Sequence, residues 1–203
     1  MKKILFLLHL PPPVHGSSIV GRNIYNSKVI NEKIKASYIN LSLSNSISKV
    51  KSVNILKIFN SFLILIKTFY SIIFNRPDLC YMALTVSGLA FFRDVMIISL
   101  LKIFRIKIVY HMHNKGVANY QNRFIYNILY RYVFNNVDVI LLSNRLYCDI
   151  EKYIKSYRIH ICPNGLSDNA KKYKKSLKTP NSPVKLLFLS NLIKSKGVYV
   201  LLD

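Results

Sequence analysis

Short apolar runs alternate with longer amphipathic segments along most of this chain. The apolar runs are the length of buried strands, and the segments between them repeat their apolar residues at helical spacing. Alternation at this spacing is typical of βαβ units. It predicts an α/β fold, a doubly wound, Rossmann-like parallel sheet with helices on both faces. The expected strands are 4–8, 36–41, 79–84, 106–112, 137–142 and 159–162, and the expected helices are 19–29, 55–74, 91–104, 124–134 and 146–153.

The opening residues imitate a secretory signal peptide. Two lysines precede a short apolar run in Met1–Leu8, but three consecutive prolines follow at 11–13 where a small-residue cleavage site would stand. A buried first strand is therefore the favoured interpretation.

Segment 55–74 is the part most easily taken for a membrane span. Polar residues recur through it at helical spacing, which makes one polar stripe on an otherwise apolar helix. Two of them are lysines, Lys57 and Lys67, and a spanning helix rarely carries two lysines in its core. We expect a helix that packs on the sheet or lies in a membrane interface.

A second α/β domain is expected to begin near Val184. Residues from there to Asp203 read as a buried strand, a polar turn and the first turns of a helix, which cannot bury their own apolar faces. We therefore expect one Rossmann-like domain over 1–166, a polar, basic linker over 167–183, and the start of a truncated domain over 184–203. Residues 43–53, rich in Ser, Asn and Lys, are expected to form a mobile loop.

The composition points to an anionic partner. Lys and Arg number 30 against 8 acidic residues, for a net charge of +22, although genome base bias could also raise the lysine content. No zinc-finger or RNP-type motif accompanies this charge, so we expect no nucleic acid. The cysteines, Cys80, Cys148 and Cys162, are far apart and fit buried small hydrophobes in a reducing compartment.

Three polar loops follow expected strands, where open α/β sheets bind ligands. Gly16 and Ser17 precede a helix whose free N–H groups suit an anion, with Ser17 or Ser18 as its cap; a plain tight turn is the alternative. His111 and His113 share one face of a strand. A metal pair is conceivable there, but no third ligand is evident, so we expect no metal. His113 alone could act as a base or hydrogen-bond partner toward a substrate hydroxyl, or it could be a core or capping residue.

The third loop lies in the expected second domain. A strand end at Ser190-Asn191 and a helix start near Gly197 bracket Lys196, a geometry suited to a diphosphate. A surface turn with a solvated lysine is the alternative.

Taken in order, these segments resemble the family-4 retaining glycosyltransferases of the two-domain GT-B fold. The resemblance is carried by the Pro-Pro-Pro-x-x-Gly-Ser loop, Arg76-Pro-Asp78, Val109–His113, Val137–Ile140, Ile161–Gly165, and Leu186-Leu-Phe-Leu with Lys196-Gly197-Val198. It implies donor-phosphate roles for Gly16, Ser17, Asn191 and Lys196, and contact of His113 with the transferring sugar. The family usually has Gly-Arg where this chain has Ser190-Asn191, which removes one cation from the diphosphate site.

The resemblance implies the N-terminal, acceptor-side domain of an enzyme without metal or cofactor. Such an enzyme would move a sugar from a nucleotide-diphosphate donor to a lipid-linked or polysaccharide acceptor, at the inner face of the cell membrane. The family's Glu-x₇-Glu pair cannot be formed, because Glu32 and Glu151 are the only glutamates. We therefore expect these 203 residues alone to be inactive. The alternative is a non-catalytic α/β module that binds anions or an anionic membrane surface.

Overall fold

The computed structural model of the chain describes residues 1–42, 55–165, 187–189 and 197–202. The chain divides into two compact units, Met1–Gly165 and Leu166–Asp203. The expected loop at 43–53, the linker at 167–183, and both Asn191 and Lys196 lie outside the described residues. In the second unit a short helix, α7 (Val198–Leu202), is described.

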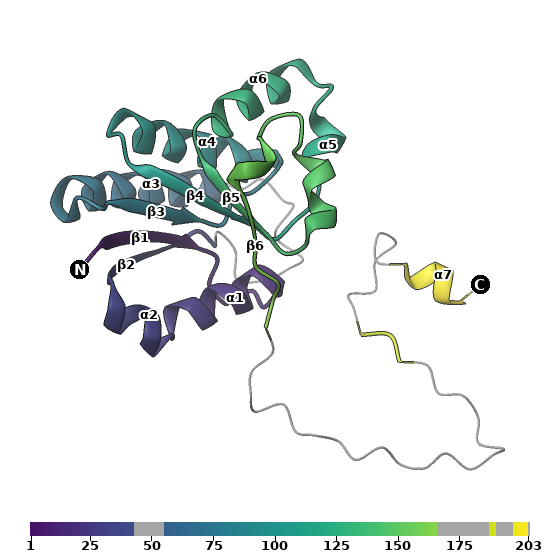
Figure 1. Ribbon diagram of the computed structural model, residues 1–203, viewed down its shortest axis with the longest axis horizontal. Helices are drawn as coiled ribbons and strands as arrows, with labels where there is room; N and C mark the ends of the chain where they lie inside the picture. The colour runs from purple at the N-terminus through teal and green to yellow at the C-terminus, as the bar shows by residue number, and fades with distance from the viewer. Residues whose placement is uncertain (43–54, 166–186, 190–196, 203) are drawn as a thin grey trace, which may run out of the picture. The chain divides into compact units, whose positions relative to one another are not determined.

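The first unit is built on a six-stranded, all-parallel sheet (Figure 1). Its order is β2-β1-β3-β4-β5-β6, so the chain moves outward from β1 in one direction and then in the other. The expected α/β fold with a parallel sheet is therefore confirmed. The strands are β1 (Lys3–Leu8), β2 (Lys35–Asn40), β3 (Leu79–Met82), β4 (Lys107–Met112), β5 (Asp138–Leu141) and β6 (Ile159–Ile161).

Helices cover both faces of this sheet. Figure 1 shows α1 and α2 on one side and α3, α4 and α6 on the other. The helices of the first unit are α1 (Gly16–Tyr25), α2 (Lys28–Lys33), α3 (Ile55–Asn75), α4 (Gly88–Ile103), α5 (Val117–Tyr120) and α6 (Phe124–Val133), with 3₁₀ turns η2 (Asn144–Asp149) and η3 (Ser156–Arg158).

Strand periodicity separates two kinds of packing. On β1, Leu5 and Leu7 are fully buried in a core shared with residues of α3, α4 and α6. Phe6 points to the other face, where its ring stacks on Tyr38 with 5.1 Å between centroids. Tyr25 at the end of α1 packs against the same Tyr38 at 4.8 Å. The two faces of β1 therefore pack separately: Leu5 and Leu7 join the main core, which also holds aromatic rings of α4 and α6, and Phe6 joins a smaller aromatic group with Tyr38 and Tyr25.

The first helix differs from its expected form. It begins at Gly16 and ends at Tyr25, and the residue that caps it is His15, whose ring accepts from the backbone N–H of Ser18. In return, the hydroxyl of Ser18 accepts a hydrogen bond from the backbone N–H of His15. The expected cap at Ser17 or Ser18 is thus wrong by two or three positions, and the expected helix 19–29 is interrupted before α2.

Two further expectations are corrected. The segment expected as a helix over 146–153 forms the 3₁₀ turn η2, and α5 was not expected. Cys148 and Cys162 are exposed, whereas Cys80 is buried as expected. All three cysteines are free thiols.

Gly21 fixes the distance between α1 and the end of β1. A Cβ placed on Gly21 would lie 2.1 Å from the carbonyl oxygen of His9, which is backbone and cannot rotate away. A Cβ on Gly16, in the first turn of the same helix, would meet nothing within 4 Å. Gly21 is therefore needed for packing, and Gly16 leaves open space.

We predict that Gly21→Ala lowers the free energy of unfolding by about 2 kcal/mol or more, because α1 must move away from His9. Gly16→Ala should keep or slightly raise stability, since alanine is the better helix former. Urea unfolding of both variants at pH 7 measures the difference, and equal stabilities would contradict this account of the close approach.

Candidate functional site

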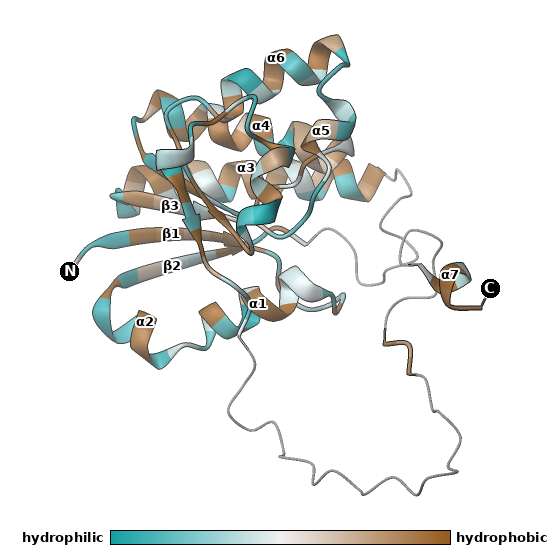
Figure 2. Cartoon of the chain, turned by 45° about the vertical axis from the view of Figure 1, so that its right-hand side comes forward, coloured by the Kyte–Doolittle hydropathy of each residue, from teal (hydrophilic) through white to brown (hydrophobic). Residues whose placement is uncertain are grey.

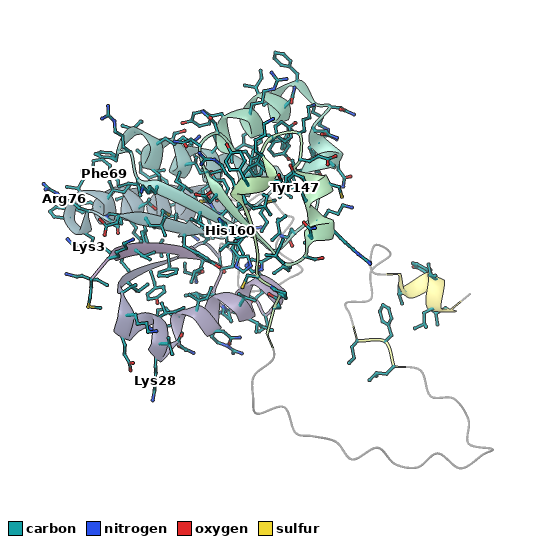
Figure 3. All side chains as sticks on the ribbon, viewed as in Figure 1. Lys3, Lys28, Phe69, Arg76, Tyr147 and His160 are labelled. Atoms are coloured by element: carbon teal, nitrogen blue, oxygen red, sulfur yellow. The ribbon has the colours of Figure 1, made fainter. Side chains whose placement is uncertain are left out.

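Four of the five histidines gather at the carboxyl edge of the sheet. His9 follows β1 and His15 caps α1, and their ring centroids are 6.0 Å apart. His111 lies in β4 and His113 follows it, with centroids 4.1 Å apart. Because the strand order reverses between β1 and β3, this edge is also the topological switch point, where open α/β sheets bind ligands. The fifth histidine, His160, lies exposed in β6 and is labelled in Figure 3.

The α1 terminus presents backbone donors beside this cluster. The N–H groups of Ser18 and Ile19 are satisfied by the side chain and carbonyl of His15. Within the described residues, the N–H groups of Gly16 and Ser17 have no such acceptor. Two free donors and the positive end of a ten-residue helix suit an anion. The structure thus brings Gly16 and Ser17 close to the histidines.

His111 in β4 and His113 just after it carry buried nitrogens without partners. His111 is 5% exposed, and the Tyr81 hydroxyl is bonded to its Nδ1. Burial raises the pKa of Tyr81, so we assign the proton to the phenol and place the ring proton of His111 on Nε2. Among the described residues, His111 Nε2 and His113 Nδ1 are buried and make no hydrogen bond. Buried polar atoms of this kind are rare in folded proteins, so these two nitrogens single out the pair as unusual.

Burial keeps this cluster neutral at pH 7. It lowers the pKa of His9 to about 3, with further contributions from Arg93, His15 and His113. It lowers the pKa of both His111 and His113 to about 4, and that of His113 is lowered further by His111 and His15. Neutral imidazoles accept or donate hydrogen bonds but supply no charge. These rings therefore suit hydroxyl groups, and an anion here would be held by the helix N–H groups.

A buried ion pair lies close to His9. Arg93 and Asp94 on α4 are 2% and 0% exposed, and Arg93 Nη2 lies 2.7 Å from Asp94 Oδ1. Arg93 also donates to the carbonyl of Leu41 just after β2, and Asp94 accepts from the N–H of Thr85 after β3. The pair thereby fixes two chain segments at the carboxyl edge, and its guanidinium is close enough to lower the pKa of His9.

A second carboxylate fixes the loop that follows His113. Asp149 is 4% exposed, and its two oxygens accept from the backbone N–H groups of Gly116, Val117 and Ala118 at 2.8, 3.0 and 3.1 Å. Gly116 has φ +147°, a backbone conformation that favours glycine. Asp149 therefore holds the turn that sets the direction of the chain after His113.

The sequence pointed to Gly16, Ser17 and His113, and the structure brings these three together. The sequence prediction missed His9, the capping role of His15, the Arg93–Asp94 pair and Asp149. An acidic residue adjacent to an arginine inside an apolar helix was the available signal for the pair. No signal in the sequence marks Asp149, because its partners are backbone groups 31 to 33 residues away.

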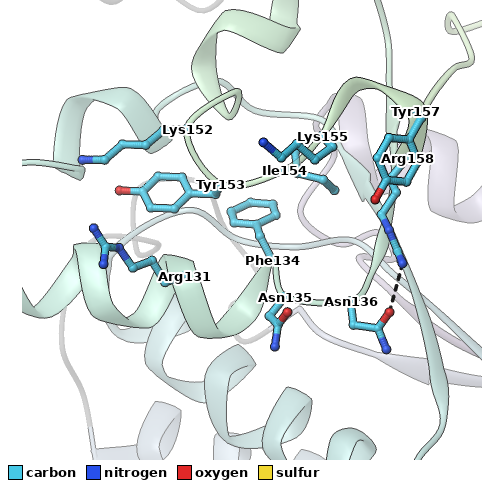
Figure 4. Close-up of a pocket in the computed structure, with 10 residues that line it drawn as sticks. All are labelled: Arg131, Phe134, Asn135, Asn136, Lys152, Tyr153, Ile154, Lys155, Tyr157 and Arg158. Atoms are coloured by element: carbon cyan, nitrogen blue, oxygen red, sulfur yellow. Dashed lines mark hydrogen bonds between the residues drawn. The ribbon is translucent and has the colours of Figure 1, made fainter.

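A hollow of about 440 Å³ lies at the opposite, amino-terminal edge of the sheet (Figure 4). It borders the starts of β5 and β6, and its lining carries four basic side chains and no acidic one: Arg131, Lys152, Lys155 and Arg158. Arg158 donates to Asn136 Oδ1 at 3.1 Å, the bond drawn in Figure 4. None of its lining residues is a histidine.

Among the described residues, no group of three metal-ligating side chains forms. No protein-family model matches this chain, and no curated protein matches it in sequence.

We predict that stability falls as the pH is lowered from about 6.5 to 4. The histidines have lowered pKa values when folded, so the unfolded chain binds more protons in this window and is favoured by acid. Each unit by which folding lowers a pKa corresponds to about 1.4 kcal/mol, so the free energy of unfolding should fall by a few kcal/mol across this pH range. Urea unfolding at a series of pH values measures the slope. His9→Gln should reduce it and His160→Gln should not, and equal slopes in the two variants would refute this assignment.

We predict that Arg93→Met destabilises the protein by about 3–5 kcal/mol, because it leaves a buried carboxylate without its partner. Arg93→Met combined with Asp94→Leu should recover much of that loss. A double-mutant cycle by chemical denaturation checks this, and additive losses would mean that the two side chains stabilise the fold independently.

Proposed function

We propose that the first unit is the acceptor-side domain of a retaining sugar transferase that uses a nucleotide-diphosphate sugar. The observation that carries the proposal is the neutral histidine cluster beside the free N–H groups of Gly16 and Ser17. Backbone donors without charge, next to uncharged imidazoles, match a ligand that combines phosphate with sugar hydroxyls. The parallel sheet and the order of its loops also agree with the resemblance to the family-4 glycosyltransferases.

In this proposal each group has one task. The C–O bond between the sugar and the diphosphate breaks, and negative charge grows on the departing phosphate oxygen. The acceptor's hydroxyl oxygen forms the new bond to the anomeric carbon, and its proton passes to the departing diphosphate. The N–H groups of Gly16 and Ser17 stabilise that charge. His113 hydrogen-bonds a hydroxyl of the transferring sugar. The acceptor is a lipid-linked or polysaccharide chain, and the transfer takes place at the inner face of the membrane.

A second candidate function is anion binding without catalysis. The observation that favours it is the hollow in Figure 4, where Arg131, Lys152, Lys155 and Arg158 meet no acidic residue in the lining. A phosphate or polyanion bound there would need no contribution from the histidines. The two functions therefore predict ligands at opposite edges of one sheet.

Histidine NMR separates the two functions. We predict that a nucleotide-diphosphate sugar such as UDP-glucose or GDP-mannose shifts the imidazole signals of His15 and His113 in the ¹⁵N-histidine-labelled chain, and leaves His160 unchanged. His113→Ala should weaken binding of the nucleotide sugar by about fivefold, because one hydrogen bond is lost, and should leave binding of inorganic pyrophosphate unchanged. Gly16→Ala should weaken binding of both ligands, because its methyl group would occupy the open space at Gly16 where the ligand is proposed to lie.

The contrary results are equally specific. Unchanged His15 and His113 signals at millimolar ligand would overturn the transferase proposal. In a second, uniformly ¹⁵N-labelled sample, shifts confined to the backbone signals around Lys152 and Arg158, abolished by Lys152→Glu, would support anion binding at the hollow instead.

A further inference from the structure

The long helix α3 has its polar and apolar faces reversed relative to an ordinary surface helix. Its hydroxyl residues face the sheet: Thr68 is 0% exposed, Ser71 is 8% exposed, and Ser61 is partly buried. The hydroxyl part of the polar stripe therefore faces inward, while Asn60, Lys67 and Asn75 remain exposed. Surface helices of water-soluble domains usually place such residues outward.

The inward hydroxyls are accommodated within the helix. Thr68 donates to the carbonyl of Ile64 at 2.8 Å, and Ser61 donates to that of Lys57 at 2.7 Å. Ile64 and Ile72, between them, join the core beneath the sheet. By length and composition α3 could cross a membrane. Leaving the sheet to do so would uncover this core, so its place in the structure argues against a span.

The outward face of α3 is an apolar stripe; Figure 2 colours α3 and the rest of the chain by the hydropathy of each residue. The helical spacing puts its members on one side, and they extend over about 24 Å of helix. The stripe continues to Phe104, the residue that follows α4, whose ring packs edge to face on Phe69 with 6.0 Å between centroids. The exposed fractions run from 37% to 73% in Ile58, Phe59, Phe62, Ile66, Phe69, Tyr70, Ile73 and Phe74.

The charge around this stripe favours an anionic occupant. Residues 55–75 contain two lysines and no acidic residue. The one acidic residue of α4, Asp94, is fully buried and paired. Figure 3 shows Phe69 and Arg76 at the end of the unit where Lys3 begins β1. An apolar stripe on a strongly basic molecule matches a bilayer that offers both acyl chains and anionic headgroups.

We infer that α3 is a docking surface that lies flat in the interface of an anionic bilayer and inserts its outward stripe among the lipids. A groove of about 420 Å³ between α3 and the edge strand β2 adds depth to this surface, since Ile66, Tyr70 and Phe74 line it. The inference rests on the stripe and the charge, and it holds whether or not the transferase proposal does.

The docking has a consequence if the transferase proposal is right. Three residues separate the end of α3 from the start of β3, so α3 runs antiparallel to the strands and its first turns lie toward their carboxyl ends. Those turns carry Ile58, Phe59 and Phe62. Docking there brings the histidine edge toward the headgroups, where a lipid-linked acceptor is held.

The chain contains no tryptophan, which allows a sharp test. We predict that Phe62→Trp gives a blue-shifted emission with vesicles of phosphatidylglycerol and phosphatidylcholine, and quenching by brominated acyl chains. Pure phosphatidylcholine should give a much smaller shift. High salt should reverse the binding, because headgroup attraction is screened. Tyr157→Trp, at a residue 77% exposed beside the basic hollow, should show no shift.

A pair of polar substitutions completes the test. Phe59→Ser with Phe62→Ser should weaken vesicle binding by about tenfold or more, and both sites are already exposed, so folding should survive. Phe124→Ser with Ile125→Ser on α6, at residues 79% and 61% exposed, is the matched control and should bind normally.

Three outcomes would overturn the inference. Absence of a shift at Phe62→Trp, together with dimerisation in sedimentation that Phe59→Ser and Phe62→Ser abolish, would assign the stripe to a second copy of the chain. Equal shifts at both tryptophans would place the lipid contact elsewhere. Retention in the membrane after alkaline carbonate washing would show that α3 spans the bilayer.

Discussion

The carboxyl edge of this sheet depends on a salt bridge buried between neighbouring residues of one helix. Arg93 and Asp94 both project from α4 into the interior, where unpaired charges would be strongly unfavourable. Each partner also binds backbone beyond the helix, Arg93 at Leu41 and Asp94 at Thr85. The geometry after β2 and β3 is therefore tied to the position of α4. His9, held between this pair and α1, inherits its environment from the same contacts.

The candidate site follows from two opposed electrostatic conditions. The guanidinium of Arg93 and the end of α1 provide positive potential, while burial keeps the imidazoles uncharged. A charged cluster would repel itself and would bind any anion. A neutral cluster over fixed positive dipoles can distinguish a ligand by its hydroxyl groups as well as by its charge. Under the proposed function, such selectivity would favour a sugar phosphate over a simple phosphate ion.

Much of the fold could be predicted from the sequence, because buried parallel strands are marked by local apolar runs. The apolar run Ile4–Leu8, for example, is recognised as a strand rather than a signal peptide because prolines follow it at 11–13. The failures lie where the decisive partner is distant. Asp149 is one polar residue among many until it meets Gly116. His15 outcompetes two serines as a cap because its ring Nδ1 reaches the N–H of Ser18. Gly21 gives no local sign that the His9 carbonyl lies against it.

Helix α3 shows that an amphipathic pattern does not by itself decide which face packs against the protein. Its periodicity correctly indicates one polar and one apolar face, but periodicity alone does not say which face meets the protein. The hydroxyls of Ser61 and Thr68 satisfy themselves on carbonyls one turn earlier, so the polar face loses little by turning inward. The apolar face gains nothing in water, and it gains substantially in a lipid interface. The membrane interface proposed above would give this outer side an environment other than water and would account for the orientation of α3.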